Sequence, residues 1–331
     1  MNIVRKLLRL QTYQPLNIIE ISKDNLLHNY KVLSSINKKV KVAPVLKSNA
    51  YGHGLTLVAK VLDSIASLQN DKIPFFCVDS IYEAYELLKA NIKTPLLIMG
   101  YINPENLKVK KLPFSFAVWD LDLAHAISKY QSHAGVHIFV DTGMGREGVM
   151  ISELPQFLEK LSKIPNLKIE GLMSHLASGE LPDDPLTRLQ LKNFQLAQKI
   201  VKKHGIHPKW IHISNSGGAL NNLNPGCNMA RVGLALYGID PCPPVSLRAT
   251  KGSAAISSMN KIASSTSSIA QGPRNDGLRP VLKLSTKIIQ IKTLQKGDMA
   301  GYDRTFTAKK AMTVGILPLG YHDGVDRRLS N

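Results

Sequence analysis

Eight short apolar segments rich in Val, Ile and Phe recur along the first 240 residues, and helical patterns separate most of them. They span residues 40–46, 75–78, 96–99, 114–118, 136–141, 169–174, 210–213 and 231–236. Residues 186–204 between two of these segments show apolar side chains at helical spacing, and Gly205 follows as a stop signal. Strands that alternate with helices are typical of parallel sheets. The pattern predicts an α/β fold, a TIM-type (β/α)8 barrel over residues 16–240.

An open, doubly wound parallel sheet is the alternative fold. Such a sheet usually carries a glycine-rich phosphate-binding loop after its first strand. The segment that follows residues 40–46 is KSNAYGHG, which lacks this glycine pattern. The barrel is therefore the favoured prediction.

The character of the sequence changes after Tyr237. Residues 241–277 are rich in Ser, Ala, Pro and Gly and show little periodicity, which indicates a linker or an insertion. Strand-like alternation resumes in VLKLSTKIIQIKTL and AMTVGILPLG. Residues 278–331 are therefore expected to begin a β-rich second domain, although about fifty residues are few for a self-sufficient one. Residues 1–15 are expected to be a short lead-in.

Charge and hydropathy limit the partners of the chain. The formal net charge is +18, but the lysines form short, scattered clusters and no run interleaves basic with aromatic residues. A nucleic-acid surface is therefore not expected. No stretch of about 18 apolar residues is present, so no membrane span is expected either.

The N-terminal segment and the cysteines indicate the compartment. Arg5, Lys6 and Arg9 interrupt the apolar core that a secretory signal would need. The three cysteines are widely spaced and odd in number, so neither a disulfide framework nor a metal site is expected. This cysteine usage suits a reducing cytoplasm.

Residues with chemically useful side chains follow several of the predicted strands. Lys47 and Tyr51 follow the first strand, the segment DTGMGREG with Arg146 follows the fifth, and His175 ends the sixth. Each residue alone has a structural explanation, such as a solvated strand end, a core histidine or a helix cap. Catalytic groups of TIM-type barrels lie at the C-terminal ends of the strands, however. Their joint placement at that end predicts an active site.

The segment SNSGG after the seventh strand has the composition of a phosphate site. Ser216 offers a hydroxyl group, Gly217 and Gly218 let backbone N–H groups approach a ligand closely, and a helix N-terminus favours an anion. A phosphate site together with a lysine at a strand end suggests pyridoxal 5'-phosphate. The aldehyde of this cofactor forms a Schiff base with an amine, and its ring stores carbanion charge.

The segment VLKSNAYGHG resembles the cofactor-lysine motif of alanine racemases. DTGMGREG, SHLAS, HISNSGG, RVGLALYG, GYDRTFTA and GYHDGVDRRLSN match that family in the same order. The resemblance runs from IIEISKDNLLHN at residues 18–29 to the last residue and therefore covers nearly the whole chain. It implies a pyridoxal-phosphate-dependent isomerase that interconverts L-alanine and D-alanine by a two-base mechanism. It further implies a barrel followed by a β domain, a head-to-tail homodimer with shared active sites, and a role in supplying D-alanine for cell-wall peptidoglycan.

The resemblance also implies roles for individual residues. Lys47 would hold the cofactor and act as one base, and Tyr302 would be the opposite base. Arg231 would face the pyridine nitrogen and, because an arginine does not release a proton to it, would keep the ring a modest electron sink. His175 would hydrogen-bond toward Tyr302, and Arg146 would orient the substrate carboxylate or the cofactor's phenolic oxygen. The phosphate would be held by Tyr51, Ser216, Gly233 and Leu234, with Asn215 beside them.

The sequence departs from the family pattern at two places. Many members have a lysine, often carbamylated, two residues before the aspartate of DTGMGR, and here that position is Phe139. Family chains also continue past RRLSN into a Cys-Met segment and a further tyrosine, so the chain is expected to be truncated within its second domain.

Several other functions share most of these motifs and stay open. One is a racemase of serine, lysine or a broad range of amino acids. Another is a non-catalytic pyridoxal-phosphate-binding barrel, although GYDRTFTA argues for an enzyme. A related decarboxylase would need a cysteine-bearing segment in the second domain, which the sequence lacks. An inactive, truncated racemase is the last alternative.

Overall fold

The computed structural model describes residues 14–66, 73–242 and 277–326. Its contacts divide these residues into two compact units. Residues 22–242 and 277–281 form the first unit, and residues 14–21 and 282–326 form the second. Each unit is described by itself below.

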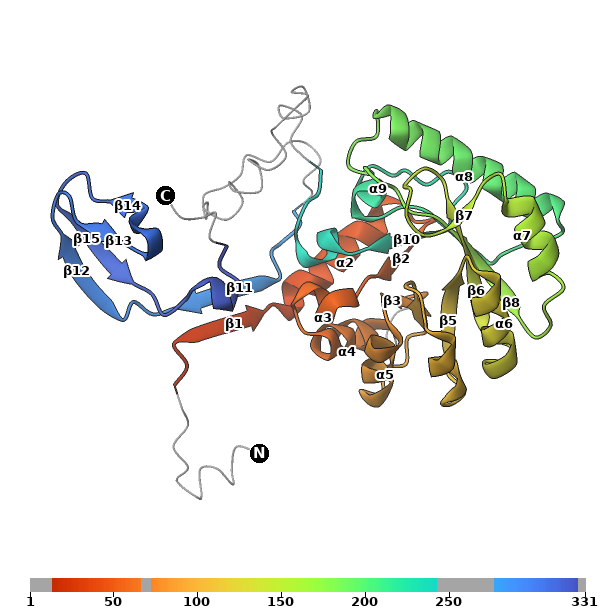
Figure 1. Cartoon of the computed structure of the whole chain (residues 1–331), viewed down its shortest axis with the longest axis horizontal. Coiled ribbons are helices and arrows are strands. Elements are labelled where there is room, and N and C mark those ends of the chain that lie inside the picture. The colour runs from red at the N-terminus through yellow and green to blue at the C-terminus, as the bar shows by residue number, and fades with distance from the viewer. Residues whose placement is uncertain (1–13, 67–72, 243–276, 327–331) are drawn as a thin grey trace, which may run out of the picture. The chain divides into compact units, whose positions relative to one another are not determined.

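The first unit is built around eight parallel strands (Figure 1). They are β2 (Lys41–Pro44), β3 (Phe76–Val78), β4 (Leu96–Ile98), β5 (Phe114–Val118), β6 (Gly135–Asp141), β8 (Lys168–Met173), β9 (Trp210–His212) and β10 (Met229–Val232). Strands β3, β4, β5, β6, β8 and β9 pair side by side in that order, and β10 pairs with β2.

Backbone contacts join these two sheets into a closed barrel. A bridge between Val45 and Cys77 connects the end of β2 to β3. The N–H of Asn228 donates to the carbonyl oxygen of Ile211 at 3.0 Å, which connects β10 to β9. The predicted TIM-type barrel is thus confirmed.

Helices surround the barrel, and several of them begin at a residue whose side chain caps the first turn. They are α2 (Lys23–Ile36), α3 (Lys47–Tyr51), α4 (Leu55–Ala66), α5 (Ile81–Lys89), η1 (Pro104–Lys108), α6 (Leu121–Tyr130), α7 (Leu154–Leu161), α8 (Pro185–Lys203), α9 (Ser216–Leu220) and η2 (Leu234–Tyr237). Ser80 and Glu83 form a capping box on α5, and Asp184 caps α8 ahead of a proline in its first turn. The helix expected at residues 186–204 is α8, and Gly205 after it has a φ of 72°.

The last predicted strand ends earlier than the sequence suggests. Residues 231–236 were expected to form one strand, but β10 stops at Val232 and η2 follows. The backbone N–H groups of Gly233 and Ala235 donate to the hydroxyl oxygen of Ser216, at 3.0 and 3.3 Å. Because a side chain takes these donors, they are not available to a neighbouring strand, and the chain turns.

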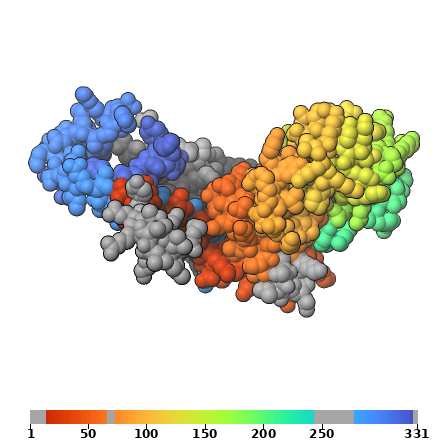
Figure 2. Space-filling view, turned by 90° about the horizontal axis from the view of Figure 1, so that it is seen from below, coloured from red at the N-terminus to blue at the C-terminus, as the bar shows by residue number. Residues whose placement is uncertain are grey.

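Alternate residues of β6 face two different cores. Ile138 and Val140 pack into an apolar cluster with Phe194 of α8 and other buried residues of α7 and β8. Phe139, between them in sequence, packs with Met173 in a separate cluster. This alternation follows the period of two in a strand and separates the helix-covered layer from the barrel interior. In the space-filling view the unit, from orange to green, forms one closely packed body (Figure 2).

The second unit consists of paired antiparallel strands. The pairs are β1 (Asn17–Ile21) with β11 (Leu282–Thr286), β12 (Gln290–Leu294) with β15 (Met312–Ile316), and β13 (Met299–Ala300) with β14 (Phe306–Thr307). Short 3-10 turns, η4 (Tyr302–Arg304) and η5 (Tyr321–Asp323), complete it. The expected β-rich character of the second domain is confirmed.

The predicted domain limits stay predictions. The barrel was expected to begin at residue 16, whereas β1 pairs with β11 of the second unit. The expected lead-in at residues 1–15 and the expected linker at residues 241–277 lie almost entirely outside the described residues. Among the residues that the structure describes, none of the helices is long and apolar enough to cross a membrane.

Candidate active site

Lys47 lies three residues after β2 and opens an unusual turn. Ser48, Asn49, Ala50 and Tyr51 all have φ of 54–55°, so four consecutive residues with a Cβ atom adopt the left-handed conformation. This conformation costs roughly 1–2 kcal/mol for each such residue. The surrounding structure must therefore hold the turn in place.

Side chains from two directions hold this turn. The carboxylate of Glu83 accepts the N–H of Ser48 at 2.6 Å and, through its other oxygen, the N–H of Asp79 at 2.9 Å. The side-chain oxygen of Asn49 accepts the N–H of Leu55 at 2.8 Å, which ties the turn to the start of α4. These contacts fix the backbone from which the Lys47 side chain extends.

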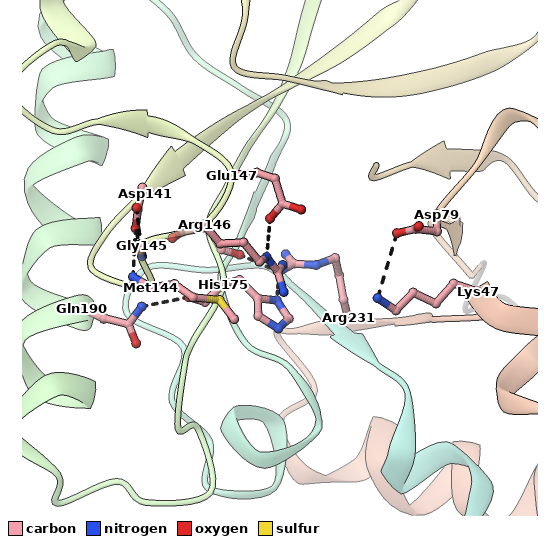
Figure 3. Close-up of polar contacts among 11 residues, drawn as sticks. Lys47, Asp79, Asp141, Met144, Gly145, Arg146, Glu147, His175, Gln190 and Arg231 are labelled. Carbon is pink, nitrogen blue, oxygen red and sulfur yellow. Dashed lines mark hydrogen bonds and ion pairs between the residues drawn. The ribbon is translucent and has the colours of Figure 1, made fainter. Parts of the chain in front are cut away.

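The amino group of Lys47 has one acidic neighbour within ion-pair distance among the described residues. Its Nζ lies 4.0 Å from Oδ1 of Asp79 (Figure 3). The lysine and aspartate side chains are 37% and 59% exposed, so this ion pair is weak. The amino group can therefore exchange Asp79 for another partner at little cost.

A second group of contacts joins Tyr51 to the ends of β9 and β10. A Cβ atom at position 233 would lie 2.4 Å from the hydroxyl oxygen of Tyr51, so only glycine lets the phenol approach there. Burial is the main cause that raises the pKa of Tyr51, which keeps the phenol a hydrogen-bond donor. The hydroxyl oxygen of Ser216 accepts two N–H groups, including that of Gly233, so its own proton is left to donate elsewhere.

Asn215 and the glycines after Ser216 have a packing role in the structure. The side chain of Asn215 caps α9 by accepting the N–H of Gly218 at 3.0 Å, and it donates to the carbonyl oxygen of Leu176 at 3.1 Å. A Cβ atom at Gly217 would lie 2.5 Å from the backbone nitrogen of Glu180. Leu234, the remaining predicted phosphate contact, begins η2 and is partly exposed.

Arg231 is a buried cation in the barrel. Only 3% of the residue is exposed, and none of the ion pairs among the described residues includes it. Its Nη2 donates to the carbonyl oxygen of Ser174 at 2.5 Å and to Nδ1 of His175 at 3.2 Å. Its Nη1 donates to Nδ1 of His212. Burial lowers the pKa of Arg231 to about 10, so the guanidinium stays charged at neutral pH.

His175 is held as a neutral imidazole. Its Nδ1 accepts from Arg231, which has no acceptor atoms, so the ring proton of His175 is on Nε2. Burial, followed by the positive charges of Arg231, Arg146 and Lys47, lowers the pKa of His175 to about 3. Gln190 donates to the backbone carbonyl of His175 at 2.9 Å and fixes its main chain (Figure 3).

The loop that carries Arg146 is shaped by Asp141. The carboxylate of Asp141 accepts the N–H groups of Gly143, Met144 and Gly145 at 2.8–3.0 Å. The guanidinium of Arg146 then pairs with Glu147, and both side chains are about half exposed (Figure 3).

Phe139, at the family's lysine position, is buried in the apolar cluster of the barrel interior. Its ring packs edge-on against Trp119, with ring centroids 5.7 Å apart. It contributes no charge, and the charged partner of Arg146 among the described residues is Glu147.

The predicted site residues of the barrel lie at the C-terminal ends of its strands. Tyr51 approaches Gly233 closely, Gly233 is hydrogen-bonded to Ser216, and Arg231 is hydrogen-bonded to His175. Tyr302 belongs to the second unit, where it begins η4 and is 78% exposed. None of the three cysteines forms a disulfide bond, and no group of three metal-binding side chains occurs among the described residues.

Sequence reasoning missed four residues that contact these groups. They are Asp79 and Glu83 beside Lys47, Glu147 beside Arg146, and His212 beside Arg231. His212 stands in the motif HISNSGG, three residues before Asn215, so its position was visible even though its contact was not.

Comparisons with known proteins agree with this geometry. Residues 21–241 match the family "Alanine racemase, N-terminal domain" and residues 281–331 match "Alanine racemase, C-terminal domain". The chain is 32% identical over 324 residues to the alanine racemase of Sorangium cellulosum, a match that covers 94% of this chain and 76% of that one. It is also 32% identical to alanine racemase 2 of Caldanaerobacter subterraneus subsp. tengcongensis, over 95% of this chain and 74% of that one.

Solved structures show the same relationship. Alanine racemase from Clostridium difficile 630 superimposes with a TM-score of 0.76 at 27% identity, covering 96% of this chain and 76% of that one. Alanine racemase from Bacillus anthracis with bound L-Ala-P gives the same TM-score, identity and coverage. The resemblance found in the sequence motifs is thereby confirmed, and the chain belongs to the alanine racemase family.

Proposed function

We propose that this chain interconverts L-alanine and D-alanine with pyridoxal 5'-phosphate bound to Lys47. Membership of the family supports the reaction and the substrate. One observation supports the residues assigned to the site. Lys47 follows the end of β2, and Tyr51, Gly233 and Ser216 lie in a chain of contacts at the ends of β9 and β10.

The residues present fit the cofactor. Ser216 and Tyr51 are hydroxyl donors held next to backbone that is free of a Cβ atom at Gly233, as a phosphate group requires. Lys47 supplies an amine that, within the described part of the chain, forms only the weak, exposed ion pair with Asp79. When bound, the cofactor supplies an electron sink for the carbanion that forms when the substrate loses its α-proton.

Three residues of the barrel transfer the proton or supply positive charge. Lys47 takes or returns the α-proton on one face of the substrate. Arg231 would face the ring nitrogen of the cofactor and, because a guanidinium does not give up its proton, would keep the electron sink modest. Arg146 supplies a cation for the substrate carboxylate, and its own charged neighbour is Glu147.

The second base is Tyr302. A phenol with an unperturbed pKa near 10 is a poor base at neutral pH unless a neighbour accepts its proton or polarises it. His175 is suited to polarise the phenol because its ring is neutral, its orientation is fixed by Arg231, and its Nε2–H is left to donate to the phenol oxygen. We further assign the protein to the cytoplasm as a homodimer that supplies D-alanine for peptidoglycan, which is the setting that the family resemblance implies.

A racemisation assay tests the proposal. Purified full chain is saturated with pyridoxal 5'-phosphate, and loss of optical rotation is followed from L-alanine and separately from D-alanine. Both directions should proceed to an equal mixture, and Lys47→Ala should lose the activity. A folded, cofactor-loaded protein that racemises another amino acid but leaves alanine unchanged would overturn the substrate, and one that racemises none would overturn the function.

A further inference from the structure

A line of polar side chains runs through the barrel interior from Arg231 toward the opposite ends of the strands. Nη1 of Arg231 donates to Nδ1 of His212. Nε2 of His212 lies 2.8 Å from Nδ1 of His137, and both histidines are fully buried. Nε2 of His137 lies 3.9 Å from Oε2 of Glu170, which accepts the hydroxyl of Ser115 at 2.8 Å.

The chemistry of Arg231 fixes the proton positions along this line. A guanidinium has only donors, so Nδ1 of His212 must be the acceptor and its proton must be on Nε2. That N–H donates to Nδ1 of His137, which places the proton of His137 on Nε2 as well. The Nε2–H of His137 faces the carboxylate of Glu170 at 3.9 Å, an ion-pair distance rather than a hydrogen-bond distance. Donors therefore point in one direction from the guanidinium to the carboxylate.

The electrostatics agree with this arrangement of neutral rings between two charges. Burial is the largest cause that lowers the pKa of both His137 and His212, and the charge of Arg231 adds to it. The carboxylate of Glu170 opposes the shift at His137, but the pKa of this ring is still lowered. The pKa of Glu170 is lowered to about 2, with the contact to His137 as the main cause. Arg231 and Glu170 are thus ionised and the rings between them are neutral at neutral pH.

Two glycines and a bulge make room for these side chains. A Cβ atom at Gly171 would lie 2.1 Å from Nδ1 of His137, and one at Gly135 would lie 2.2 Å from Oε2 of Glu170. The pairing of β6 with β8 jumps from Val136 opposite Ile169 to His137 opposite Gly171, which leaves Glu170 as the extra residue. Bulges are uncommon in parallel pairs, and they redirect side chains. The backbone is therefore shaped around the carboxylate and the ring.

We propose that His137 and Glu170 are positioning residues that hold His212 in the tautomer needed to fix the guanidinium of Arg231. Without an acceptor at His137, the His212 ring could take the other tautomer, whose Nδ1–H would face a donor of Arg231 across a dry interior. Loss of that contact would free the buried guanidinium to change its orientation. The link to catalysis rests on the proposed function, whereas the tautomers and their dependence on His137 do not.

Nitrogen NMR of the full chain tests the tautomers directly. Protein labelled with ¹⁵N at histidine, without cofactor, is compared with His137→Gln, which keeps a carbonyl acceptor, and with His137→Phe, which keeps none. His212 should be the neutral Nε2–H form in the wild type and in His137→Gln, and should shift toward the Nδ1–H form in His137→Phe. The His212→Asn spectrum assigns the signal. An Nδ1–H form of His212 in the wild type would overturn the proposal, even if His137→Phe fails to fold.

Kinetics of the cofactor-loaded enzyme give the second measurement. Partners that orient metal-ligating histidines typically contribute about ten- to a hundredfold to activity, and we take that range as the scale for His137. We expect His137→Phe to lower kcat by that factor with KM changed less than about twofold, and His137→Gln to recover most of the loss. Glu170→Gln keeps the shape of the side chain and loses its charge, so its kcat should lie between those of His137→Phe and His137→Gln.

The matched control is Asp63→Asn, which removes the charge of another carboxylate that accepts backbone and side-chain donors, here from Thr94. It should lower stability without changing kcat or the His212 signal. The proposal would be overturned if kcat and the His212 signal changed equally in His137→Phe, His137→Gln and Asp63→Asn. The line of side chains would then have only a structural role. A wild type that does not racemise alanine would instead overturn the proposed function, and the NMR result would still decide the tautomers.

Discussion

The backbone N–H of Ser48 donates to the carboxylate of Glu83 at 2.6 Å, across 35 residues of sequence. The same carboxylate closes the capping box of α5, so one side chain begins a helix and holds the turn that follows Lys47. Local preference opposes this turn, because Ser48 and its three successors are left-handed without being glycine. The position of the Lys47 backbone is therefore maintained by a tertiary contact rather than by the local sequence.

Glycine at position 48 should stabilise the protein. Ser48 is exposed and its φ is 55°, so Ser48→Gly removes a left-handed penalty of roughly 1–2 kcal/mol. It adds backbone freedom to the unfolded chain worth about 0.5–1 kcal/mol, which leaves a small net gain. Urea unfolding should show a higher midpoint. Ser35→Gly, at an exposed position of the right-handed helix α2, should lower it, and a lower midpoint for both variants would contradict the strain argument.

Lys47 should be the residue that binds the cofactor covalently. Purified protein incubated with pyridoxal 5'-phosphate and reduced with borohydride should carry the label on the peptide that contains Lys47. Lys47→Ala should lose the label, whereas Lys41→Ala, at the other end of β2, should retain it. Peptide mapping by mass spectrometry decides the site. A label that stays at full level in folded Lys47→Ala would assign the cofactor to another lysine.

The barrel strands could be predicted because each one is marked by a short apolar run in its own segment of the sequence. Apolar runs such as residues 114–118 and 136–141 are bounded by turn residues and became β5 and β6 with little change. The end of β10 could not be predicted in the same way. It depends on the hydroxyl of Ser216, which takes the N–H of Gly233 from a different part of the chain.

The site was only partly visible in the sequence for the same reason. Motifs identified residues such as Lys47 and Arg231 but not what they contact. The left-handed turn has no glycine among its first four residues to mark it, and its partner Glu83 lies on another helix. The contact between Arg231 and His212 joins neighbouring strands, so no spacing rule within one segment describes it.

Stability should fall as the pH is lowered from 7 to about 5. Burial is the main cause that lowers the pKa values of His137, His175 and His212, so below about pH 6.5 the unfolded chain binds protons that the native chain does not. The full contribution is present above the unfolded pKa and is lost on acidification, at about 1.4 kcal/mol per pH unit for each histidine. Urea unfolding at several pH values measures the slope.

Substitution of one histidine should reduce that slope. His137→Gln removes one of the three histidines whose pKa is lowered, so the free energy of unfolding should change with pH by about one proton less. Phe157→Leu, in the apolar cluster of α7, should lower stability at every pH without changing the slope. Glu170, with a native pKa of about 2, adds its own loss only below about pH 4.5, outside this window. An unchanged slope in His137→Gln would mean that this ring is already protonated in the native protein.

The last prediction concerns Lys47 and Tyr302, which lie in different units of the chain. The family resemblance implies that each active site takes its lysine from one subunit and its tyrosine from the other. Lys47→Ala and Tyr302→Phe should each be nearly inactive alone, because each removes one of the two proton-transfer groups from every site. The alanine and phenylalanine replacements leave the Tyr51–Gly233–Ser216 contacts in place, so cofactor phosphate binding should survive in both.

Mixing the two variants separates a shared site from a site within one chain. After dissociation and reassociation, a mixed dimer has one site that lacks both bases and one site that has both. If chains pair at random and sites act independently, activity should return to about a quarter of the wild-type value. The mixed species is verified by isolating it through a tag carried on one variant only. A verified mixed dimer without recovered activity would place Tyr302 in the site of its own chain or outside the catalytic machinery, because only a shared site can restore a complete pair of bases.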